Sequence, residues 1–204
     1  MKILFDLDST VTACETLPFI ASHFGIREDI EATTLNAVRG KSDFEESFRQ
    51  RVAILGKLDV GEVADVVTTV PLHDSLADFI KTHADICAIA TSNLDCWCAK
   101  LAGKLGCRFH SSKAILSGNR ITEISEILDK KEIVCRYQDQ EEYVAFCGDG
   151  HNDLKAMQAS DYAIEVAITH SPIRALTDCA RLTVHSEKEL TDALNSLLAG
   201  KVII

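Results

Sequence analysis

The apolar side chains of this chain follow two different patterns. Between residues 13 and 72 they recur at helical spacing, which predicts four helices, at 15–24, 26–38, 43–55 and 60–69. Elsewhere, short apolar runs of strand length alternate with amphipathic stretches. Strands that alternate with helices are typical of a parallel sheet that is covered by helices on both faces.

The second pattern predicts strands at 2–8, 86–91, 143–147, 162–166 and 181–184, with short β segments near Arg108, at 114–116 and at 120–122. It predicts helices at 74–83, 94–105, 128–137, 151–158, 171–177 and 187–198. We therefore expect an α/β protein with a Rossmann-like parallel sheet from residues 1–12 and 73–204. A small helical cap, residues 13–72, is inserted after the first strand. Because ligands of such sheets bind beyond the carboxyl ends of the strands, the cap is expected to cover the site.

The composition narrows the class of protein. The chain has 204 residues, 47% hydrophobic and 25% charged, enough for one core domain and a smaller insert. Its formal charge of −10 argues against nucleic acid or an anionic membrane as a partner. No segment reaches the roughly 18 apolar residues of a membrane span, and the N-terminus shows no signal-peptide pattern. We expect a cytoplasmic protein that acts on a small metabolite and keeps its eight cysteines as free thiols.

Two carboxylates stand at the end of the first predicted strand. Asp6 and Asp8 follow the apolar run 3–5 and are two residues apart. Charged side chains are rarely buried unless they are paired or bind a metal. Two carboxylates this close repel each other, so a cation would stabilise them. The pair therefore predicts a metal-assisted site at the carboxyl edge of the sheet, with one acid free to attack a substrate.

A second acid pair follows the predicted strand 143–147. Asp149 lies between Gly148 and Gly150 at the strand end, and Asp153 comes about one helical turn later. Glycines on both sides let the backbone turn tightly and approach a ligand. Four carboxylates at two strand ends suit a hard cation with oxygen ligands, and we expect Mg²⁺.

Hydroxyl and cationic groups complete the expected site. Thr91, Ser92 and Asn93 follow an apolar run and open a predicted helix, where hydroxyls and free N–H groups bind phosphate. Lys130 and Lys131 open another predicted helix, and a lysine there can neutralise both a phosphate and its nucleophile. The spacing along that helix favours Lys130 over Lys131.

Each of these groups also has a purely structural interpretation. The acids suit turns and helix caps, Thr91 suits an N-cap, and the lysines suit the surface. His151, between the acids of the second pair, fits a catalytic role and a solvated loop equally well. The order along the chain favours a site, because each group follows an apolar strand or opens a helix.

The four groups resemble the four motifs of the haloacid dehalogenase superfamily of phosphohydrolases. The matching residues are Asp6-x-Asp8-x-Thr10, Thr91, Lys130 and Gly148-Asp149-Gly150-x-Asn152-Asp153. Within that superfamily the chain resembles the phosphoserine phosphatases. The segments that carry this second resemblance are 6–11 with Glu15, Gly40-Lys41-x-Asp43-Phe44 and Arg49-Gln50-Arg51-Val52.

The resemblance implies a role for each matching residue. Asp6 is expected to form an aspartyl-phosphate, and Asp8 to protonate the leaving alcohol and then activate water. Thr91 and Lys130 are expected to hold the phosphoryl group. Mg²⁺ is expected to bind to the carboxylates of Asp6, Asp149 and Asp153 and to the backbone carbonyl of Asp8. Asn152 is expected to orient the phosphate site, and Ser92 and Asn93 to contact the substrate. Glu15 is expected to recognise a substrate ammonium, and Arg51 a substrate carboxylate.

Two departures from the phosphoserine phosphatase pattern bear on the substrate. Thr91-Ser92-Asn93 stands where those enzymes usually have Ser-Gly-Gly, and His170-Ser171-Pro172 stands where they have Ala-Lys-Pro. Both leave phosphoryl transfer possible. They keep open a different small phosphate, such as a sugar, keto or amino-alcohol phosphate, in place of phosphoserine, and a phosphotransferase in place of a hydrolase.

Two other classes fit the sequence less well. A signalling receiver also groups acids, a threonine and a lysine around Mg²⁺, but the N-terminal position of Asp6 and the helical insert argue against it. A silent binding protein of the same fold is not indicated, because no motif acid is missing. The exact substrate and the oligomeric state stay open.

Overall fold

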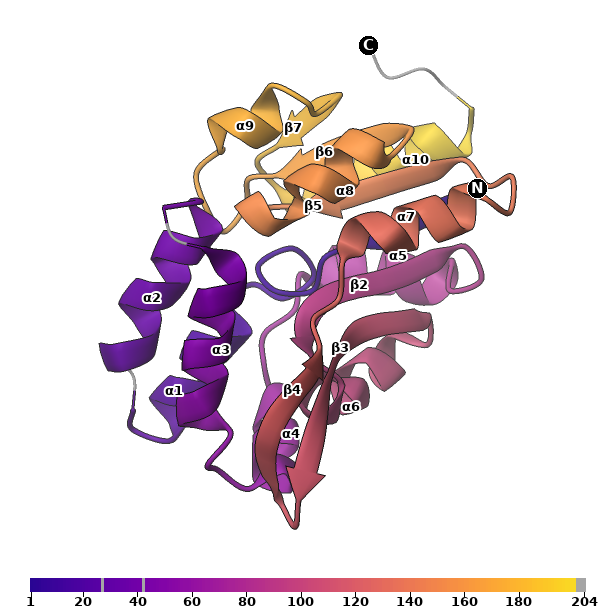
Figure 1. The fold of residues 1–204 in the computed structure, drawn as a ribbon. Helices are drawn as coiled ribbons and strands as arrows, with labels where there is room; N and C mark the ends of the chain where they lie inside the picture. Colours follow the sequence, from indigo (N-terminus) through magenta and orange to yellow (C-terminus); the bar gives the residue numbers. More distant parts are fainter. Residues whose placement is uncertain (27, 42, 201–204) are drawn as a thin grey trace.

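Seven strands form one sheet in the computed structural model, which describes residues 1–26, 28–41 and 43–200. Their order is β4-β3-β2-β1-β5-β6-β7 (Figure 1). The strands are β1 (Lys2–Phe5), β2 (Cys87–Leu94), β3 (Arg108–Ser117), β4 (Arg120–Glu126), β5 (Val144–Gly148), β6 (Tyr162–Val166) and β7 (Leu182–Val184). Neighbouring strands are parallel except β3 and β4, whose two-residue connection permits only an antiparallel pair. The predicted α/β fold is confirmed, and the β segments predicted at 114–116 and 120–122 form an antiparallel pair at one edge of the sheet.

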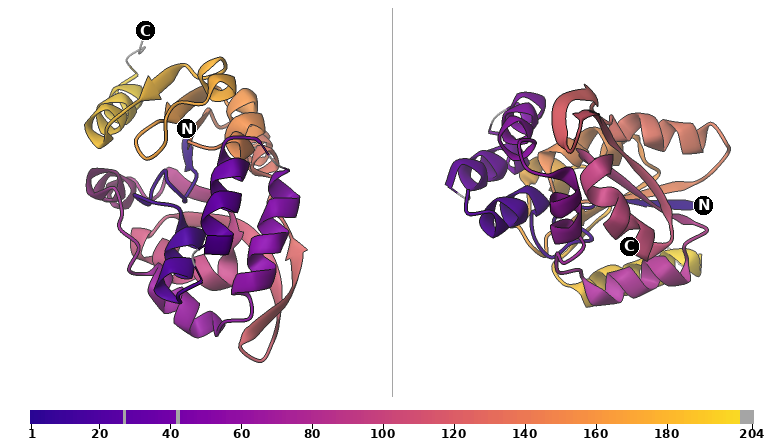
Figure 2. Two further views of the ribbon diagram at one scale, coloured as in Figure 1. Left: turned by 90° about the vertical axis from the view of Figure 1, so that its left-hand side faces the viewer. Right: turned by 90° about the horizontal axis from the view of Figure 1, so that it is seen from below.

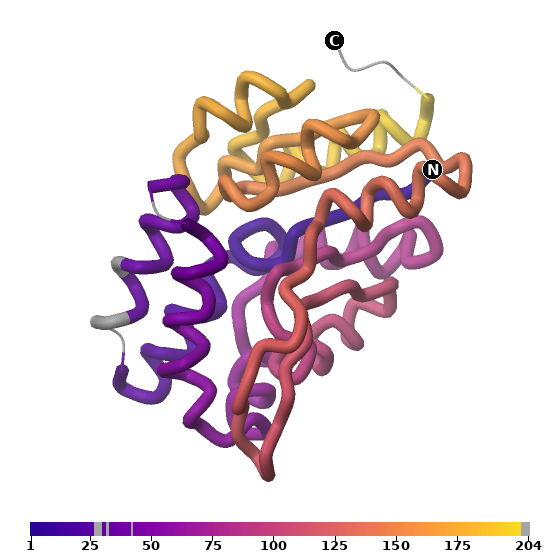
Figure 3. The backbone as a smooth tube through the Cα atoms, in the orientation of Figure 1, coloured from indigo at the N-terminus to yellow at the C-terminus, as the bar shows by residue number. Residues whose placement is uncertain are grey.

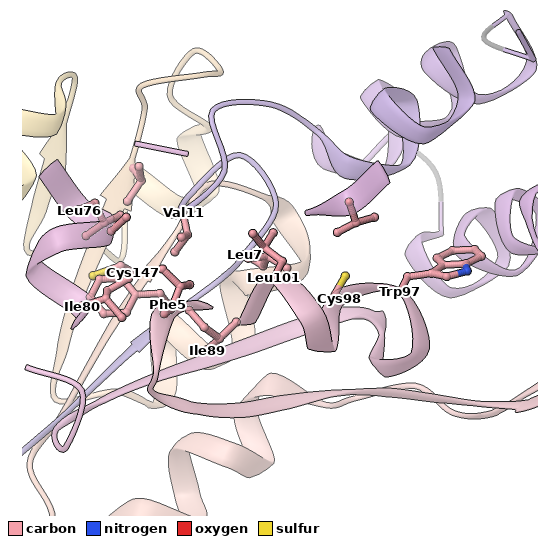
Figure 4. Close-up of a cluster of buried hydrophobic side chains, with 14 of the residues drawn as sticks. Phe5, Leu7, Val11, Leu76, Ile80, Ile89, Trp97, Cys98, Leu101 and Cys147 are labelled. Carbon is pink, nitrogen blue, oxygen red and sulfur yellow. The ribbon is translucent and has the colours of Figure 1, made fainter. Parts of the chain in front are cut away.

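Both faces of the sheet are covered by helices. Successive residues of a strand point to opposite faces, and on β1 Ile3 and Phe5 belong to one buried cluster while Leu4 belongs to another. Figure 4 shows Phe5 in the first cluster, beside side chains of α5 and α6. The covering helices are α5 (Asp74–Thr82), α6 (Asp95–Leu105) and α10 (Glu187–Leu198) on this face, and α7 (Lys130–Gln138), α8 (Leu154–Ala159) and α9 (Arg174–Thr177) on the other. β1 is the central strand of the sheet and is buried on both faces.

Helices α1–α4 fill the segment between β1 and α5. Their bounds are α1 (Thr16–His23), α2 (Glu28–Val38), α3 (Phe44–Leu55) and α4 (Val60–Val67). Asp43 and Asp59 set the starts of α3 and α4, since each side chain accepts hydrogen bonds from N–H groups of the first turn. Helices α1–α3 lie beyond the carboxyl ends of the strands, and α4 packs against α6 (Figures 1 and 2). The predicted run of helices is confirmed, apart from positions 27 and 42, which lie outside the described residues.

The two chain segments that enter and leave this helical run are bonded to each other. Thr12 and Leu72 form an isolated antiparallel bridge. Beside it, Ala13 N donates to Pro71 O at 2.8 Å. The predicted boundaries of the cap coincide with this bridge, and the division into cap and core remains our prediction.

Two features of the fold bear on the expected cellular setting. No helix within residues 1–26, 28–41 and 43–200 is long and apolar enough to cross a membrane. All eight cysteines lie in the described part of the chain, and none is paired in a disulfide.

Candidate active site

The loop after β1 carries the first acid pair. β1 ends at Phe5, earlier than the predicted 2–8, so Asp6 and Asp8 lie in a tight loop before α1 (Figure 3). Asp6 N donates to Cys147 O on β5 at 2.9 Å, which fixes the start of the loop at the edge of the sheet. Asp6 is 4% exposed, and its Oδ1 accepts a hydrogen bond from Leu7 N at 2.7 Å. The nucleophile candidate is thus buried and oriented by the backbone.

Lys130 is the lysine that reaches these acids. Its Nζ lies 2.7 Å from Asp6 Oδ1 and 2.6 Å from Asp153 Oδ1, and only 2% of its side chain is exposed. Lys131 is exposed on the next position of α7. Burial disfavours the charged form of Lys130, but the carboxylates of Asp153 and Asp6 outweigh it and raise its pKa. The two carboxylates therefore favour the charged form of Lys130 next to Asp6.

The second acid pair is held by the backbone at the end of β5. Asp153 Oδ2 accepts hydrogen bonds from Asp149 N at 3.2 Å and from Gly150 N at 3.1 Å. A Cβ on Gly148 would lie 2.5 Å from Asp153 Cγ, so only glycine leaves room for this carboxylate. Thr10 Oγ1 donates to Asp149 Oδ1 at 2.9 Å and orients that side chain. Gly148 therefore allows the carboxylate of Asp153 to lie close to the backbone of the same motif.

Asp6, Asp149 and Asp153 can hold one metal ion. One carboxylate oxygen of each lies within 4.8 Å of the other two, and all three residues are buried. Burial raises the pKa of Asp6 and of Asp149 well above the ordinary value, and neighbouring acids add to the shift, so a bound cation would stabilise their anionic forms. Three buried carboxylate oxygens suit a hard divalent cation such as Mg²⁺. The predicted fourth ligand, the carbonyl of Asp8, remains a prediction.

Asp8 lies between β2 and the start of α1. Thr91 Oγ1 donates to Asp8 Oδ2 at 3.3 Å, and Asn93 Nδ2 lies 3.4 Å from both oxygens of Asp8. Thr16 N donates to Asp8 Oδ1 at 3.0 Å. Burial and the nearby charge of Glu15 raise the pKa of Asp8. A raised pKa favours the protonated carboxyl, which a general acid needs.

Residues 91–93 belong to β2, so the predicted end of this strand at residue 91 is wrong, whereas the helix predicted at 94–105 begins only one residue later. β2 continues to Leu94, and α6 begins at Asp95. The pairing of β2 with β3 continues past Thr91 after a register shift, which keeps the chain extended. Asn93 N donates to Thr91 Oγ1 at 3.0 Å, and Ser92 and Asn93 both line the pocket above the acids.

Glu15 and Arg51 reach that same pocket from the helical segment. The pocket also contains Asp6, Asp8 and Asp149, and it has an empty volume of about 460 Å³ that includes open solvent. The structure therefore brings together residues that are separated along the chain. Their predicted contacts with a substrate remain predictions.

Arg51 is buried without an acidic partner. It is 4% exposed, and its hydrogen bonds go to Ser47 O at 3.2 Å and Thr34 Oγ1 at 3.0 Å. Within the described chain no carboxylate forms an ion pair with it. Burial lowers the pKa of Arg51, while the charges of Glu15 and Asp8 oppose that shift. A buried guanidinium that has no ion-pair partner is suited to bind an anionic group of a ligand.

The sequence did not assign a role to two residues that contact Glu15. Ser9 Oγ donates to Glu15 Oε1 at 2.9 Å, and His170 Nε2 lies 2.9 Å from the same oxygen. His170 Nε2 is also 3.9 Å from Asp149 Oδ2. The sequence did contain one indication that His170 matters, because His170-Ser171-Pro172 replaces the Ala-Lys-Pro of the phosphoserine phosphatase pattern.

The two remaining residues of the second acid motif differ in position. Asn152 lines the pocket, and its role in orienting the phosphate remains a prediction. His151 is exposed, and its ring lies against Gly40 at the end of α2, where a Cβ would be 2.7 Å from His151 Cγ. The structure thus places His151 at the contact between the helical segment and the sheet, outside the pocket that holds Asp6 and Asp8.

Comparisons with known proteins identify the family of this chain. A family model of haloacid dehalogenase-like hydrolases matches residues 3–158. A phosphoserine phosphatase of Methanocaldococcus jannaschii is 27% identical over 184 residues, which cover 84% of this chain and 86% of that protein. A phosphoserine phosphatase of Streptomyces coelicolor is 27% identical over 185 residues, and the match spans only 44% of its length.

Solved structures share the fold. A substrate-bound phosphoserine phosphatase superposes with a TM-score of 0.82 at 24% identity, covering 95% of this chain and 98% of that one. A phosphoserine phosphatase in the form of a phospho-aspartyl intermediate analogue gives 0.81 at 24% identity, covering 94% and 97%. With the family model matched over most of its length, this chain belongs to the haloacid dehalogenase-like hydrolases, and among them it is similar to phosphoserine phosphatases.

Proposed function

We propose that this protein is a cytoplasmic, Mg²⁺-dependent phosphomonoesterase that hydrolyses a small phosphorylated metabolite, with phosphoserine as the leading substrate. The observation that carries the proposal is the single pocket that contains Asp6, Asp8, Glu15 and Arg51. It combines a nucleophile and an acid–base group with one anionic and one cationic group for the substrate. The phosphoserine phosphatases among its relatives support the same conclusion.

The charges of the pocket match the groups of phosphoserine. The guanidinium of Arg51, buried and without an acid, would bind the substrate carboxylate. Glu15 would accept a hydrogen bond from the ammonium. Phe44 and Phe48 line the pocket from α3 and would exclude water around the bound substrate.

The reaction follows from the contacts of Asp6 and Asp8. Oδ1 of Asp6 is held by Lys130 and by a backbone N–H, so Oδ2 is the oxygen left to attack phosphorus. As the Oδ2–P bond forms, the bond from phosphorus to the substrate oxygen breaks. Asp8 gives its proton to that leaving oxygen. Asp8 then removes a proton from water, which attacks phosphorus, releases phosphate and restores the Asp6 carboxylate.

Asp6, Asp149 and Asp153 would hold the Mg²⁺. When bound, the cation neutralises negative charge on the phosphoryl group and on the acids around it. Lys130 adds a positive charge beside the attacking carboxylate of Asp6. The hydroxyl of Thr91 donates to Oδ2 of Asp8, whereas Thr16 N donates to Oδ1, and the Thr91 hydroxyl would bind the phosphoryl group.

A different small phosphate, or transfer of the phosphoryl group to an alcohol, is the second candidate function. Ser92 and Asn93 line the pocket at positions where phosphoserine phosphatases usually have glycines. Both side chains occupy space beside the phosphate site. The substrate or the acceptor of the phosphoryl group can therefore differ from those of the relatives.

The test combines two variants with a panel of phosphorylated metabolites. Asp6→Asn should abolish turnover, and mass spectrometry should detect no phosphorylated form of this variant. Asp8→Asn should still accept a phosphoryl group from p-nitrophenyl phosphate, whose leaving group needs no proton, and should lose it slowly. Full activity of Asp6→Asn would exclude Asp6 as nucleophile. A sugar or keto phosphate that ranks far above phosphoserine would favour the second candidate.

A further inference from the structure

The carboxylate of Glu15 is held through one oxygen only. Ser9 Oγ donates to Glu15 Oε1 at 2.9 Å, and His170 Nε2 lies 2.9 Å from the same atom. Oε2 accepts no hydrogen bond within the described part of the chain. Glu15 is the N-cap residue of α1, yet its side chain forms no cap hydrogen bond with that helix. Glu15 lines the pocket that contains Asp6 and Asp8, and only one of its two carboxylate oxygens is held by these neighbours.

The loop that carries His170 is itself bonded to the loop of the first acid pair. Thr169 Oγ1 donates to Ser9 O at 3.2 Å. Ser9 has a φ of 58°, a left-handed conformation that a serine adopts only when its surroundings hold it there. Ser9, Glu15, His170 and Thr169 thus form a closed ring of contacts. This ring joins the β6–α9 loop to the start of the helical segment.

We propose that His170 is a positioning residue that gives this enzyme its selectivity for a substrate amine. An ionised carboxylate can only accept hydrogen bonds, so His170 donates from Nε2. With Oε1 held by Ser9 and His170, the carboxylate of Glu15 has one orientation in the pocket, and Oε2 is the oxygen left to receive the ammonium. This inference rests on the proposed function, in which Glu15 binds the substrate ammonium. The phosphoserine phosphatase pattern has Ala-Lys-Pro where this chain has His170-Ser171-Pro172, so that pattern has no histidine at this segment.

His170 also lies near Asp149, so an effect through Glu15 must be distinguished from an effect through the metal site. Nε2 lies 3.9 Å from Asp149 Oδ2, and Asp149 is a proposed Mg²⁺ ligand. If His170 acted through the metal site, its loss would change the Mg²⁺ requirement and the turnover of every substrate. If it acts through Glu15, its loss changes only the binding of substrates that carry an amine.

The experiment compares the full-length protein with His170→Ala, His170→Asn and His170→Gln at saturating Mg²⁺. Two substrates are used, phosphoserine and 3-phosphonooxypropanoate, which differs from it only by lacking the amine. His170→Ala should raise the KM for phosphoserine about tenfold, the effect of losing one hydrogen bond to a charged group, and leave kcat within about twofold. The KM for the amine-free substrate and the Mg²⁺ concentration for half-activation should stay unchanged.

The two amides test the geometry of the hydrogen bond. The Nε2 of Gln can donate near the position of the imidazole Nε2, so His170→Gln should restore the KM for phosphoserine. The shorter Asn cannot reach Glu15 and should behave like Ala. His151→Ala is the matched control, because His151 is an exposed histidine near the site that lies outside this pocket.

Each contrary outcome identifies what fails. A wild-type protein without preference for phosphoserine over the amine-free substrate overturns both the role of Glu15 and that of His170. A wild-type preference that survives in His170→Ala overturns the role of His170 alone. An equal loss with both substrates, a changed Mg²⁺ requirement, or a Gln variant as impaired as Ala also overturns it, since each shows a structural or metal-centred effect.

Discussion

Lys130 Nζ lies 2.6 Å from Asp153 Oδ1, and 2% and 0% of the two side chains are exposed. The same ammonium group is 2.7 Å from Asp6 Oδ1. One buried cation thus holds the first and second acid motifs together from the start of α7. Because it compensates two carboxylates that water cannot reach, it contributes to the stability of the site as well as to its chemistry.

Replacing Lys130 by Met should destabilise the protein in a Mg²⁺-dependent way. The change leaves Asp6 and Asp153 without their buried cation, and breaking such a pair costs about 3–5 kcal/mol of unfolding free energy. Mg²⁺ should restore part of this loss, because it binds the same carboxylates and only in the folded state. Urea unfolding with and without Mg²⁺ measures both effects.

Lys131→Met is the matched control for that prediction. Lys131 is exposed on the same helix, so its loss should change the unfolding free energy by no more than about 0.5 kcal/mol. Equal losses for the two variants would mean that the ion pairs of Lys130 do not carry the stability of the site.

Replacing Arg51 by Ala should raise the KM for phosphoserine by about 10- to 100-fold, the effect of losing hydrogen bonds to a charged carboxylate. Arg51→Lys should restore little of this, because an ammonium cannot form the two parallel hydrogen bonds of a guanidinium. Steady-state kinetics with phosphoserine and with phosphoethanolamine, which lacks the carboxylate, separate recognition from packing. The KM for phosphoethanolamine should stay within about twofold.

Arg49→Ala supplies the comparison on the same helix. Arg49 is 49% exposed and pairs with Glu45 at the surface of α3, so its removal should leave both KM values unchanged. A rise of the KM for phosphoethanolamine in Arg51→Ala would show instead that Arg51 supports the shape of the pocket, through its contacts with Thr34 and the Phe48 ring.

Cys14 should react slowly with alkylating reagents below pH 10. Burial, together with the charges of Asp8 and Glu15, raises the pKa of its thiol to about 11. The thiolate is the reactive form, so a raised pKa leaves only about one molecule in a thousand reactive at pH 8. In the metal-free protein, the rate at Cys14 should rise about tenfold per pH unit from pH 7 to 10, as measured by mass spectrometry of iodoacetamide adducts. A plateau near pH 9, as for an ordinary thiol, would contradict this.

The positions of Asp6, Asp149 and Lys130 could be predicted because each depends on a local pattern. The apolar runs before the two acids form central strands, and the carboxyl ends of parallel strands lie at one edge of a sheet. Asp129 fixes the start of α7 by accepting a hydrogen bond from Lys131 N, and this places Lys130 at the first turn. Strand, edge and helix start are all encoded within a few residues.

The course of the chain after Thr91 and the position of His170 depend on distant contacts. Ser92 and Asn93 are polar and suggest a strand end, but pairing with β3 keeps β2 extended to Leu94. His170 meets Glu15 across 155 positions of the chain, from a loop without a periodic pattern. No local propensity encodes either arrangement, since tertiary pairing decides both. The contacts of Glu15 and Arg51 with a substrate remain predictions.

The contact between Gly40 and His151 yields a last prediction. Gly40 has a φ of +66°, and a Cβ there would lie 2.7 Å from His151 Cγ. Gly25 has a φ of +73° with nothing within 4 Å of its added Cβ. Gly25→Ala should therefore cost only the strain of a left-handed alanine, about 1–2 kcal/mol of unfolding free energy. Gly40→Ala should cost that strain and, in addition, the displacement of the imidazole ring.

A double-mutant cycle isolates the second contribution. In a His151→Ala background the ring is absent, so the cost of Gly40→Ala should fall to that of Gly25→Ala, whereas the cost of Gly25→Ala should be the same in both backgrounds. Gly40 follows the end of α2 (Glu28–Val38), and His151 begins the short 3₁₀ helix His151–Asp153 of the second acid motif. This coupling therefore measures how firmly the helical segment rests on that motif. Chemical denaturation of the variants gives the coupling energy, and a value indistinguishable from zero would show that the two residues do not support each other in solution.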